Sequence, residues 1–358
     1  MRGVAIILVL GAHLRPPPLH SIPPEVSILL DLWMRVGWAG VDIFFVLSGY
    51  LVSGLLFSEA RNRHTVDVKR FLIRRAFKIY PLFWLTVLLI FLARSILNAP
   101  ISPSDVLGEL LFLQNYVGKL SGPHWSLAVE EHFYLLLALL IGITHTKLRR
   151  VMCEPNFFTW VPWVFVAIVI LSTGLRWFHQ GSEDFWHLVM QTHLRLDSLF
   201  LGVFLSWLRH YRFGMLGIRH QALRFTLFNL GCLLFIPVFF FDYLSTWFMR
   251  VLVFNSVSVG AGLVLLSGAH TPNSAFQWIR PLSTMGLYSY AIYLVHEPWQ
   301  RYFVWRISNP DESLLSWWVY FILYISGAIG GGWLLTAAVE QPALRLREHL
   351  FPKNRTAP

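Results

Sequence analysis

The sequence predicts an all-α integral membrane protein with about ten transmembrane helices and both termini in the cytoplasm. Hydrophobic residues make up 56% of the 358 residues and charged residues only 13%, whereas soluble domains contain about 25% charged residues. Apolar runs of about the length that crosses a bilayer follow one another along the whole chain. Lys and Arg gather in alternate loops between these runs, and this pattern sets the orientation of the spans.

Ten apolar runs are interpreted as spans, and they lie at 3–14, 36–57, 79–97, 124–143, 159–177, 196–208, 223–241, 247–267, 283–302 and 315–339. One set of alternate loops, together with both termini, holds 20 of the 29 Lys and Arg residues, and the opposite set holds seven. Positively charged loops stay in the cytoplasm, so both termini are expected inside. We expect one transmembrane domain over 1–345, a short cytoplasmic tail over 346–358, and residence in the cytoplasmic membrane among its lipids.

The net charge of +10 does not predict nucleic-acid binding, because the basic residues lie in short loops between apolar runs. No pair of ligand-type residues has metal-site spacing, so no metal is expected.

The first run carries Arg2 and His13 on one helix. At 1.5 Å per residue the two lie about 16 Å apart, which is about half the hydrocarbon thickness of a bilayer. Arg2 is therefore expected at the membrane surface and His13 near the midplane. Ionisable residues inside a membrane are costly and usually functional. The alternative is a histidine that bonds a neighbouring helix for structure alone.

The second run, from Gly37 to Leu56, places Asp42 at its outer end and Ser48 among glycines. Small residues let helices approach closely, so ordinary membrane packing is the alternative to a functional role here. The basic element that follows contains Arg74, Arg75 and Lys78 just before a span. Such a cluster binds phosphates, or it simply marks the cytoplasmic side.

The fourth run opens with HWSLAVEEHFY and places Glu130 and Glu131 near the head of a membrane helix. Ser126 and Glu130 are four residues apart and share a face, whereas Trp125 lies on another. A carboxylate at this depth could orient or charge an imidazole. Alternatively, the two glutamates form a buried pair that Arg or Tyr from another helix satisfies.

Two later segments also carry charge. Arg195 and Asp197 precede a short apolar run, and an internal ion pair is the favoured role for them. His296 and Glu297 lie near the outer end of the ninth run.

In their order and spacing these segments resemble the membrane acyltransferase-3 family, multi-span O-acyltransferases that modify bacterial surface polysaccharides. The matching elements are Arg2 with His13; GVDIFFVLSGYL from Gly40 to Leu51; Arg74, Arg75, Lys78, Ile79 and Pro81; WSLAVEEHFY from Trp125 to Tyr134; Arg195, Asp197, Leu199 and Gly202; His296 with Pro298; and Glu340 with Pro342. Lys78 stands where the family usually has Arg. The chain ends soon after its last span, so it would work alone or with a separate glycan-assembly or esterase-like protein.

The resemblance implies transfer of an acyl group, expected to be acetyl, from acyl-coenzyme A on the cytoplasmic side. The acceptor would be a hydroxyl of a cell-surface or lipid-linked glycan. In this hypothesis His13 is the general base, and Glu130 orients and charges it. Arg2, Arg74, Arg75 and Lys78 hold coenzyme A phosphates, and the supporting residues are Asp42, Ser48, Trp125, Ser126, Glu131, Tyr134, Arg195, Asp197 and His296. The alternative is a proton-coupled transporter or flippase of a lipid-linked sugar, which would not consume acyl-coenzyme A.

Overall fold

The structure, a computed structural model, describes residues 1–18, 22–148, 158–212, 220–268 and 280–352. Within these ranges every regular element is a helix, which confirms the all-α fold class. The helices are α1 (Arg2–Ala12), α2 (Pro24–Val36), α3 (Ala39–Arg63), α4 (Val68–Ile96), α5 (Pro103–Leu110), η1 (Gly122–His124), α6 (Trp125–Leu148), α7 (Trp160–His179), α8 (Phe185–Leu188), η2 (Thr192–Leu194), α9 (Leu196–Trp207), η3 (Leu208–Arg212), α10 (Gln221–Leu233), α11 (Ile236–Phe240), α12 (Trp247–Val251), α13 (Val253–Gly268), α14 (Arg280–Trp299), η6 (Gln300–Val304), α15 (Trp305–Ser308), α16 (Leu314–Leu335), η7 (Thr336–Glu340) and α17 (Gln341–Leu350).

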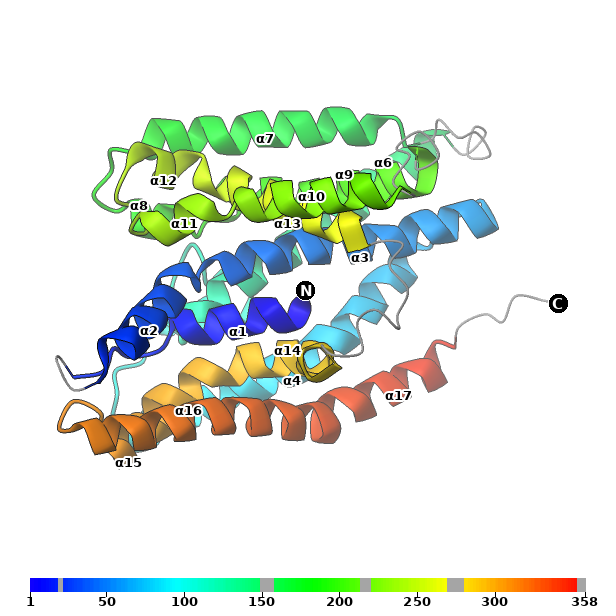
Figure 1. Cartoon of the computed structure of the whole chain (residues 1–358). Helices are drawn as coiled ribbons and strands as arrows, with labels where there is room; N and C mark the ends of the chain where they lie inside the picture. Colours follow the sequence, from blue (N-terminus) through cyan, green and yellow to red (C-terminus); the bar gives the residue numbers. More distant parts are fainter. Residues whose placement is uncertain (19–21, 149–157, 213–219, 269–279, 353–358) are drawn as a thin grey trace.

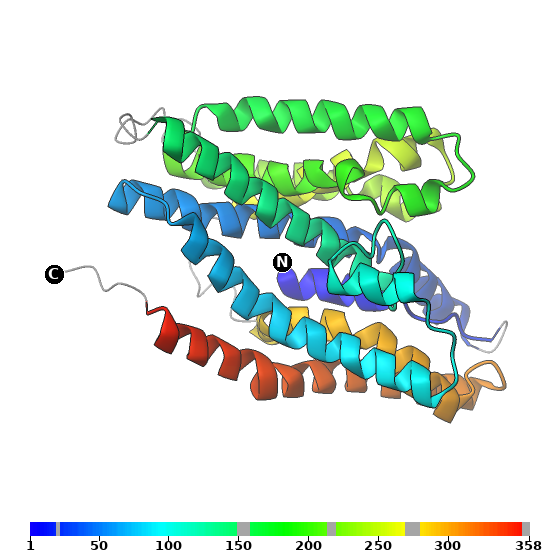
Figure 2. The ribbon, with the colours of Figure 1, turned by 180° about the vertical axis from the view of Figure 1, so that it is seen from behind.

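The long helices lie side by side in one bundle. Figure 1 shows α7, α10 and α13 on one side, α3 and α1 through the middle, and α14 and α16 on the other side. Seen from behind, α4 and α6 cross the opposite face (Figure 2). Helix α1 packs against both α3 and α14. The first helix therefore lies between α3 and α14, with Gly3, Ala5, Ile6, Val9, Leu10 and Gly11 buried.

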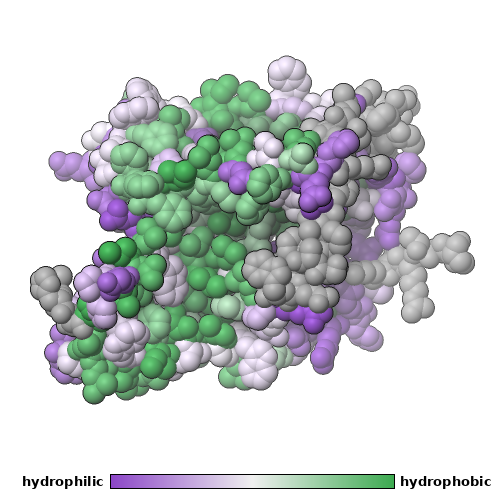
Figure 3. All heavy atoms as spheres, viewed as in Figure 1, coloured by the Kyte–Doolittle hydropathy of each residue, from purple (hydrophilic) through white to green (hydrophobic). Residues whose placement is uncertain are grey.

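The surface agrees with a membrane protein. In Figure 3 apolar side chains cover the middle of the visible face, and hydrophilic side chains gather toward its two ends. Six stretches in the described chain are long and apolar enough to cross a membrane: Ala39–Arg63, Val68–Ile96, Gly122–Thr144, Trp160–His179, Gln221–Phe240 and Leu314–Leu350. Each of the ten predicted runs overlaps a helix or two consecutive helices. The count of ten spans and the cytoplasmic termini stay predictions.

The start of α1 lies deeper in the bundle than the sequence predicted, since Arg2 was expected at the membrane surface. Both views place the N-terminus within the bundle, and in Figure 1 α1 runs from there toward the end where α2 and α15 lie. Arg2 therefore does not mark the end of the bundle. His13 follows the last turn of α1. It therefore lies closer to the end of the bundle where α2 lies than the predicted position near the midplane.

Helices α3 and α9 are in backbone contact through two glycines. A Cβ atom on Gly49 would stand 1.9 Å from the Leu199 carbonyl oxygen, and one on Gly202 would stand 2.2 Å from that of Val46. No real Cβ contact is this short, so both positions require glycine. The close packing that the glycines of the second run predicted is confirmed, and α9 is its partner.

One helix of the structure was not expected from the sequence. The amphipathic helix α2, which begins with Pro24 in its first turn, was not predicted because it is short and mixes Asp31 and Arg35 with apolar residues. The division into a domain over 1–345 and a tail over 346–358 stays a prediction; helix α17 spans this division and continues to Leu350. Residues 353–358 of the predicted tail lie outside the described residues.

Candidate active site

A pocket opens between α1, α3, α4, α6 and α14 and brings together seven residues that the sequence singled out. These residues are Arg2, Ser48, Arg75, Lys78, Ser126, Glu130 and Tyr134. They come from four helices that are far apart in the sequence. The predicted cations and the predicted carboxylate therefore share one cavity.

Glu130 is held inside this pocket by two hydroxyl groups. Ser48 Oγ donates to one carboxylate oxygen at 2.9 Å, and Tyr134 Oη donates to the other at 2.8 Å. Arg2 and Arg75 act on the carboxylate electrostatically. Among the described residues no contact joins Glu130 to His13, so the direct carboxylate–imidazole pair of the hypothesis is not present in this structure.

The neighbouring Glu131 points to a different partner. It accepts a hydrogen bond from the hydroxyl of Tyr80 on α4. The expectation that a tyrosine from another helix satisfies one glutamate therefore holds for Glu131. Glu130 instead takes its tyrosine from its own helix.

The basic element of α4 divides into two sets. Arg75 faces the pocket and lies 5.6 Å from the ring centroid of Tyr134, a cation–π distance. Lys78 also lines the pocket and forms an ion pair with Glu340. Arg74 does not line it, and its guanidinium lies 3.0 Å from the Glu348 carboxylate of α17. Arg75 and Lys78 are therefore better placed than Arg74 to meet a ligand in the pocket.

His13 faces His296 of α14 rather than a carboxylate. The two ring centroids are 4.8 Å apart and the planes stand at 74°. Each Nδ1 lies near a backbone carbonyl oxygen, that of Val9 at 3.0 Å for His13 and that of Tyr293 at 2.6 Å for His296. A carbonyl oxygen only accepts, so Nδ1 carries the proton in both neutral rings. The lone pair of each ring is then on Nε2, where it can accept a proton.

Tyr293 connects the pocket to the histidine pair. Its ring lines the pocket and lies 5.5 Å from the ring of His296, centroid to centroid. Its hydroxyl oxygen lies 2.6 Å from Ser126 Oγ and donates to the Pro123 carbonyl oxygen at 2.9 Å. The pocket and the two imidazoles are therefore adjacent parts of one polar region.

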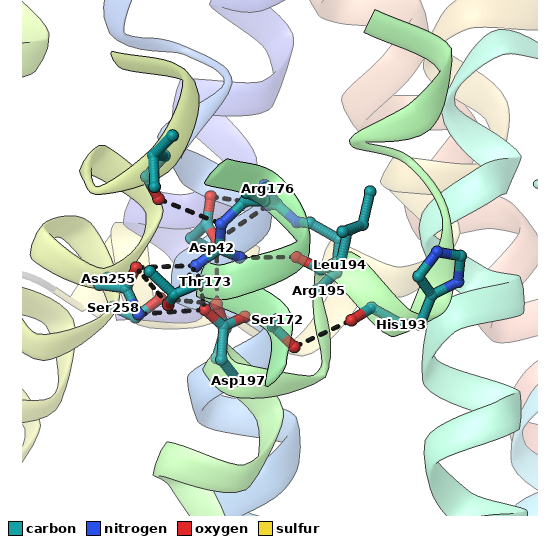
Figure 4. Close-up of polar contacts among 12 residues, drawn as sticks. Asp42, Ser172, Thr173, Arg176, His193, Leu194, Arg195, Asp197, Asn255 and Ser258 are labelled. Carbon is teal, nitrogen blue, oxygen red and sulfur yellow. Dashed lines mark hydrogen bonds and ion pairs between the residues drawn. The ribbon is translucent and has the colours of Figure 1, made fainter. Parts of the chain in front are cut away.

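A second buried cluster contains Asp42, Arg195 and Asp197 (Figure 4). Arg195 Nη2 donates to both oxygens of Asp42, at 2.8 and 2.9 Å. Asp197 instead binds Arg176 of α7 at 2.6 Å, and the Arg176 side chain is fully buried. The internal ion pair predicted for Arg195 and Asp197 is therefore corrected to two pairs with partners on other helices.

This cluster adjoins the candidate site through Trp125. The guanidinium carbon of Arg195 lies 5.6 Å from the Trp125 ring centroid and 4.3 Å from that of Phe254. Trp125 begins α6, the helix that carries Glu130. The ion pairs thus fix α3, α7, α9 and the head of α6 relative to one another.

Several residues of the site were not found from the sequence. Arg176 was counted only as a charge at a span end, and Tyr293 and Gln300 were not considered. Gln300 Nε2 donates to the carbonyl oxygen of His13 and lies 2.5 Å from Tyr320 Oη. The available signal for Arg176 was that it is the one charged residue in the apolar run at 159–177.

In the part of the chain that the structure describes, no three His, Cys, Asp or Glu side chains are grouped as metal ligands.

Comparison with known proteins finds similarity to acyltransferases. A family model described as an acyltransferase domain matches residues 1–337. The chain is 26% identical over 291 residues to a putative O-acetyltransferase of Staphylococcus aureus strain COL. This alignment covers 74% of the chain and 46% of that protein. It is 26% identical to the putative peptidoglycan O-acetyltransferase YrhL of Bacillus subtilis strain 168, over 79% of the chain and 46% of YrhL. It is 23% identical to the peptidoglycan O-acetyltransferase OatA of Listeria monocytogenes, over 83% of the chain and 48% of OatA. The chain spans about half the length of these relatives. No solved structure matches it.

Proposed function

The chain belongs to the membrane acyltransferase-3 family, and from this premise we propose that it transfers an acetyl group from acetyl-coenzyme A to a glycan hydroxyl. The donor would bind from the cytoplasmic side, and the acceptor would be a cell-surface or lipid-linked glycan on the other side of the cytoplasmic membrane. The names of the relatives support an O-acetyl product. The observation that carries the proposal is the cationic pocket that adjoins the two histidines.

The pocket suits the donor because its cations match the phosphates of coenzyme A. Arg2, Arg75 and Lys78 would bind those phosphates, and guanidinium groups do so with two parallel hydrogen bonds. The pantetheine arm would then extend along the apolar wall toward Tyr293. Glu130 would keep the cations in place and separated from one another until the donor enters.

His13 would act as the general base. Its Nε2 takes the proton of the acceptor hydroxyl while the hydroxyl oxygen attacks the thioester carbonyl carbon. A carbon–oxygen bond forms, the carbon–sulfur bond breaks, and the leaving thiolate takes the proton from the imidazolium. His296 lies against His13 and would fix the orientation of the ring. General base catalysis of this kind contributes about 10²–10⁴ in rate.

The test uses the purified protein in vesicles with radiolabelled acetyl-coenzyme A and a glycan acceptor. His13→Gln keeps a hydrogen-bonding side chain but cannot take up a proton, so transfer should fall about 100-fold or more. His64→Gln, at the exposed C-terminal end of α3, is the matched control and should remain active. Near-normal transfer by correctly inserted His13→Gln would remove His13 from proton transfer. Movement of the glycan across the membrane without loss of the thioester would overturn the proposal as a whole.

A further inference from the structure

Two further cavities lie next to η6 and α15, outside the pocket that contains Glu130. The first, here named the basic pocket, has a volume of about 420 Å³, within the range of small-molecule sites. The second, here named the apolar groove, runs along α4, α14 and α16 with a volume of about 260 Å³. Tyr302 lines both cavities, so they are neighbours on either side of this side chain.

The basic pocket has the composition of an anion site. Three arginines line it, Arg94, Arg301 and Arg306, together with Tyr302, Trp305 and Asn309, and no carboxylate lines it. Two of the arginines already face carboxylates, since Arg94 Nη1 lies 3.7 Å from Asp105 and Arg301 Nη1 lies 3.4 Å from Glu297. Arg306 is therefore the arginine of this pocket that forms no ion pair within the described residues. The buried Tyr302 hydroxyl has no hydrogen-bond acceptor in the described chain. The Tyr302 side chain is only 8% exposed. Buried donors are nearly always paired, so an acceptor from a ligand is expected here.

The apolar groove has the composition of a hydrocarbon site. Its lining is Thr86, Leu89, Ile90, Ala93, Val295, Pro298, Trp299, Tyr302, Phe303, Gly327, Gly331, Leu334 and Leu335. Gly331 leaves the groove open, since a Cβ there would meet only one Val295 methyl, at 3.8 Å. The groove opens to the outside of the bundle, since Leu89, Phe303 and Leu334 of its lining are 48%, 50% and 58% exposed. Its volume of about 260 Å³ makes it a narrow slot, which suits one hydrocarbon chain better than two.

The η6 turn connects these cavities to the candidate base. Gln300 at its start bonds the carbonyl oxygen of His13, and the next two residues, Arg301 and Tyr302, line the basic pocket. Such π-helical turns are frequent at functional sites. A ligand in the basic pocket would therefore be held within one helical turn of the residue that contacts His13.

We propose that the two cavities together bind a single-chain lipid phosphate or diphosphate that carries the acceptor sugar. The phosphate occupies the basic pocket and the hydrocarbon chain occupies the apolar groove, which leaves the sugar beside His13. This assignment rests on the proposed function, since it names the class of acceptor. A two-chain phospholipid fits less well, because the groove offers one slot.

Binding is measured first, without catalysis. The probe is a fluorescent polyprenyl phosphate added to the full-length protein in neutral detergent. Arg306→Gln should weaken its binding about 10-fold or more, because one charge-assisted contact to phosphate is lost. Gly331→Leu should weaken it at least as much, because its side chain would fill the groove. Gly330→Leu is the matched control, since no atom lies within 4 Å of a Cβ there, and it should bind normally.

Competition then identifies the ligand. Inorganic diphosphate should displace the probe only at far higher concentration than unlabelled polyprenyl phosphate. Equal potency of inorganic diphosphate, equal potency of phosphatidylglycerol, or normal binding by Arg306→Gln would each overturn the assignment. Arg35→Gln removes one charge from α2, outside the basic pocket, and should bind normally.

Acetyl transfer separates this proposal from the general one. A protein that binds the probe but transfers no acetyl group to any glycan would refute the proposed function and leave the lipid site standing. A protein that acetylates lipid-linked and lipid-free glycans with the same KM, unchanged by Arg306→Gln, would refute the lipid site and leave the function standing.

Discussion

Replacing Asp42 by asparagine should destabilise the protein by about 3–5 kcal/mol, because Arg195 would then keep its charge in the bundle interior without a carboxylate. Both side chains of this pair are at most 3% exposed. The change removes an ion pair in which one guanidinium nitrogen contacts both carboxylate oxygens, at 2.8 and 2.9 Å, and it weakens the 3.1 Å hydrogen bond from Ser198 to the same carboxylate. Arg195→Met should cost a similar amount, since it leaves Asp42 buried and charged.

The double variant distinguishes an ion pair from two independent effects. Asp42→Asn combined with Arg195→Met leaves no uncompensated charge at this pair, so the double variant should be more stable than the sum of the single changes by about 3 kcal/mol. A second cycle pairs Arg195→Met with Asp197→Asn. Asp197 binds Arg176 instead, so that coupling should be about 1 kcal/mol or less.

The assay is equilibrium unfolding in mixed detergent micelles with increasing sodium dodecyl sulfate, followed by tryptophan fluorescence. Asp31→Asn, on an exposed position of α2, is the control and should change the free energy of unfolding by less than about 0.5 kcal/mol. Additive costs in the Asp42–Arg195 cycle, or a stronger coupling between Arg195 and Asp197, would refute the pairing described above.

Three further predictions follow from other parts of the structure. Gly49→Ala should cost about 3 kcal/mol of stability in the same unfolding assay, because its Cβ would meet the Leu199 carbonyl oxygen at 1.9 Å; Gly174→Ala, with open space around it, should be tolerated. Arg75→Gln should raise the KM for acetyl-coenzyme A more than Arg74→Gln does in steady-state kinetics, because only Arg75 lines the pocket; equal effects would indicate that both act only on orientation in the membrane. Reporter fusions at the C-terminus and in the loop at 99–123 should report opposite sides of the membrane, and the same side for both would refute the predicted topology.

Local sequence patterns were sufficient to predict most of the long helices, because a membrane span depends on a run of consecutive apolar residues. The apolar runs that begin near 36, 159 and 315 match α3, α7 and α16. The pattern failed for α2, whose apolar face is short and interrupted by charge. It also could not indicate the π-helical turns of η6 and η7, since these depend on packing against neighbouring helices.

The sequence could not predict which residues far apart in the chain form hydrogen bonds and ion pairs with one another. Glu130 and Ser48 were both singled out, but their hydrogen bond joins helices 82 residues apart. Arg195 and Asp197 are close in sequence and were paired for that reason, whereas the bundle gives each a partner from another helix. Likewise His13 was matched with Glu130, and the fold instead places His296 against it.

The length of the last helical segment has a consequence for how the surrounding lipid affects the enzyme. Leu314–Leu350 comprises 37 residues, about 55 Å at 1.5 Å per residue, against about 30 Å for the hydrocarbon core. Its final turns therefore extend beyond the hydrocarbon, and they carry Arg345 and Arg347 beside the first turns of α4.

If the termini are cytoplasmic as predicted, cations at that level meet the headgroups of the inner leaflet, where each contributes about 1 kcal/mol of attraction to anionic lipids. Under the proposed topology these headgroups compete with the phosphates of the donor for the same basic surface. The apparent affinity for acetyl-coenzyme A should then fall as the share of anionic lipid in the vesicles rises, which makes donor use depend on the composition of the inner leaflet.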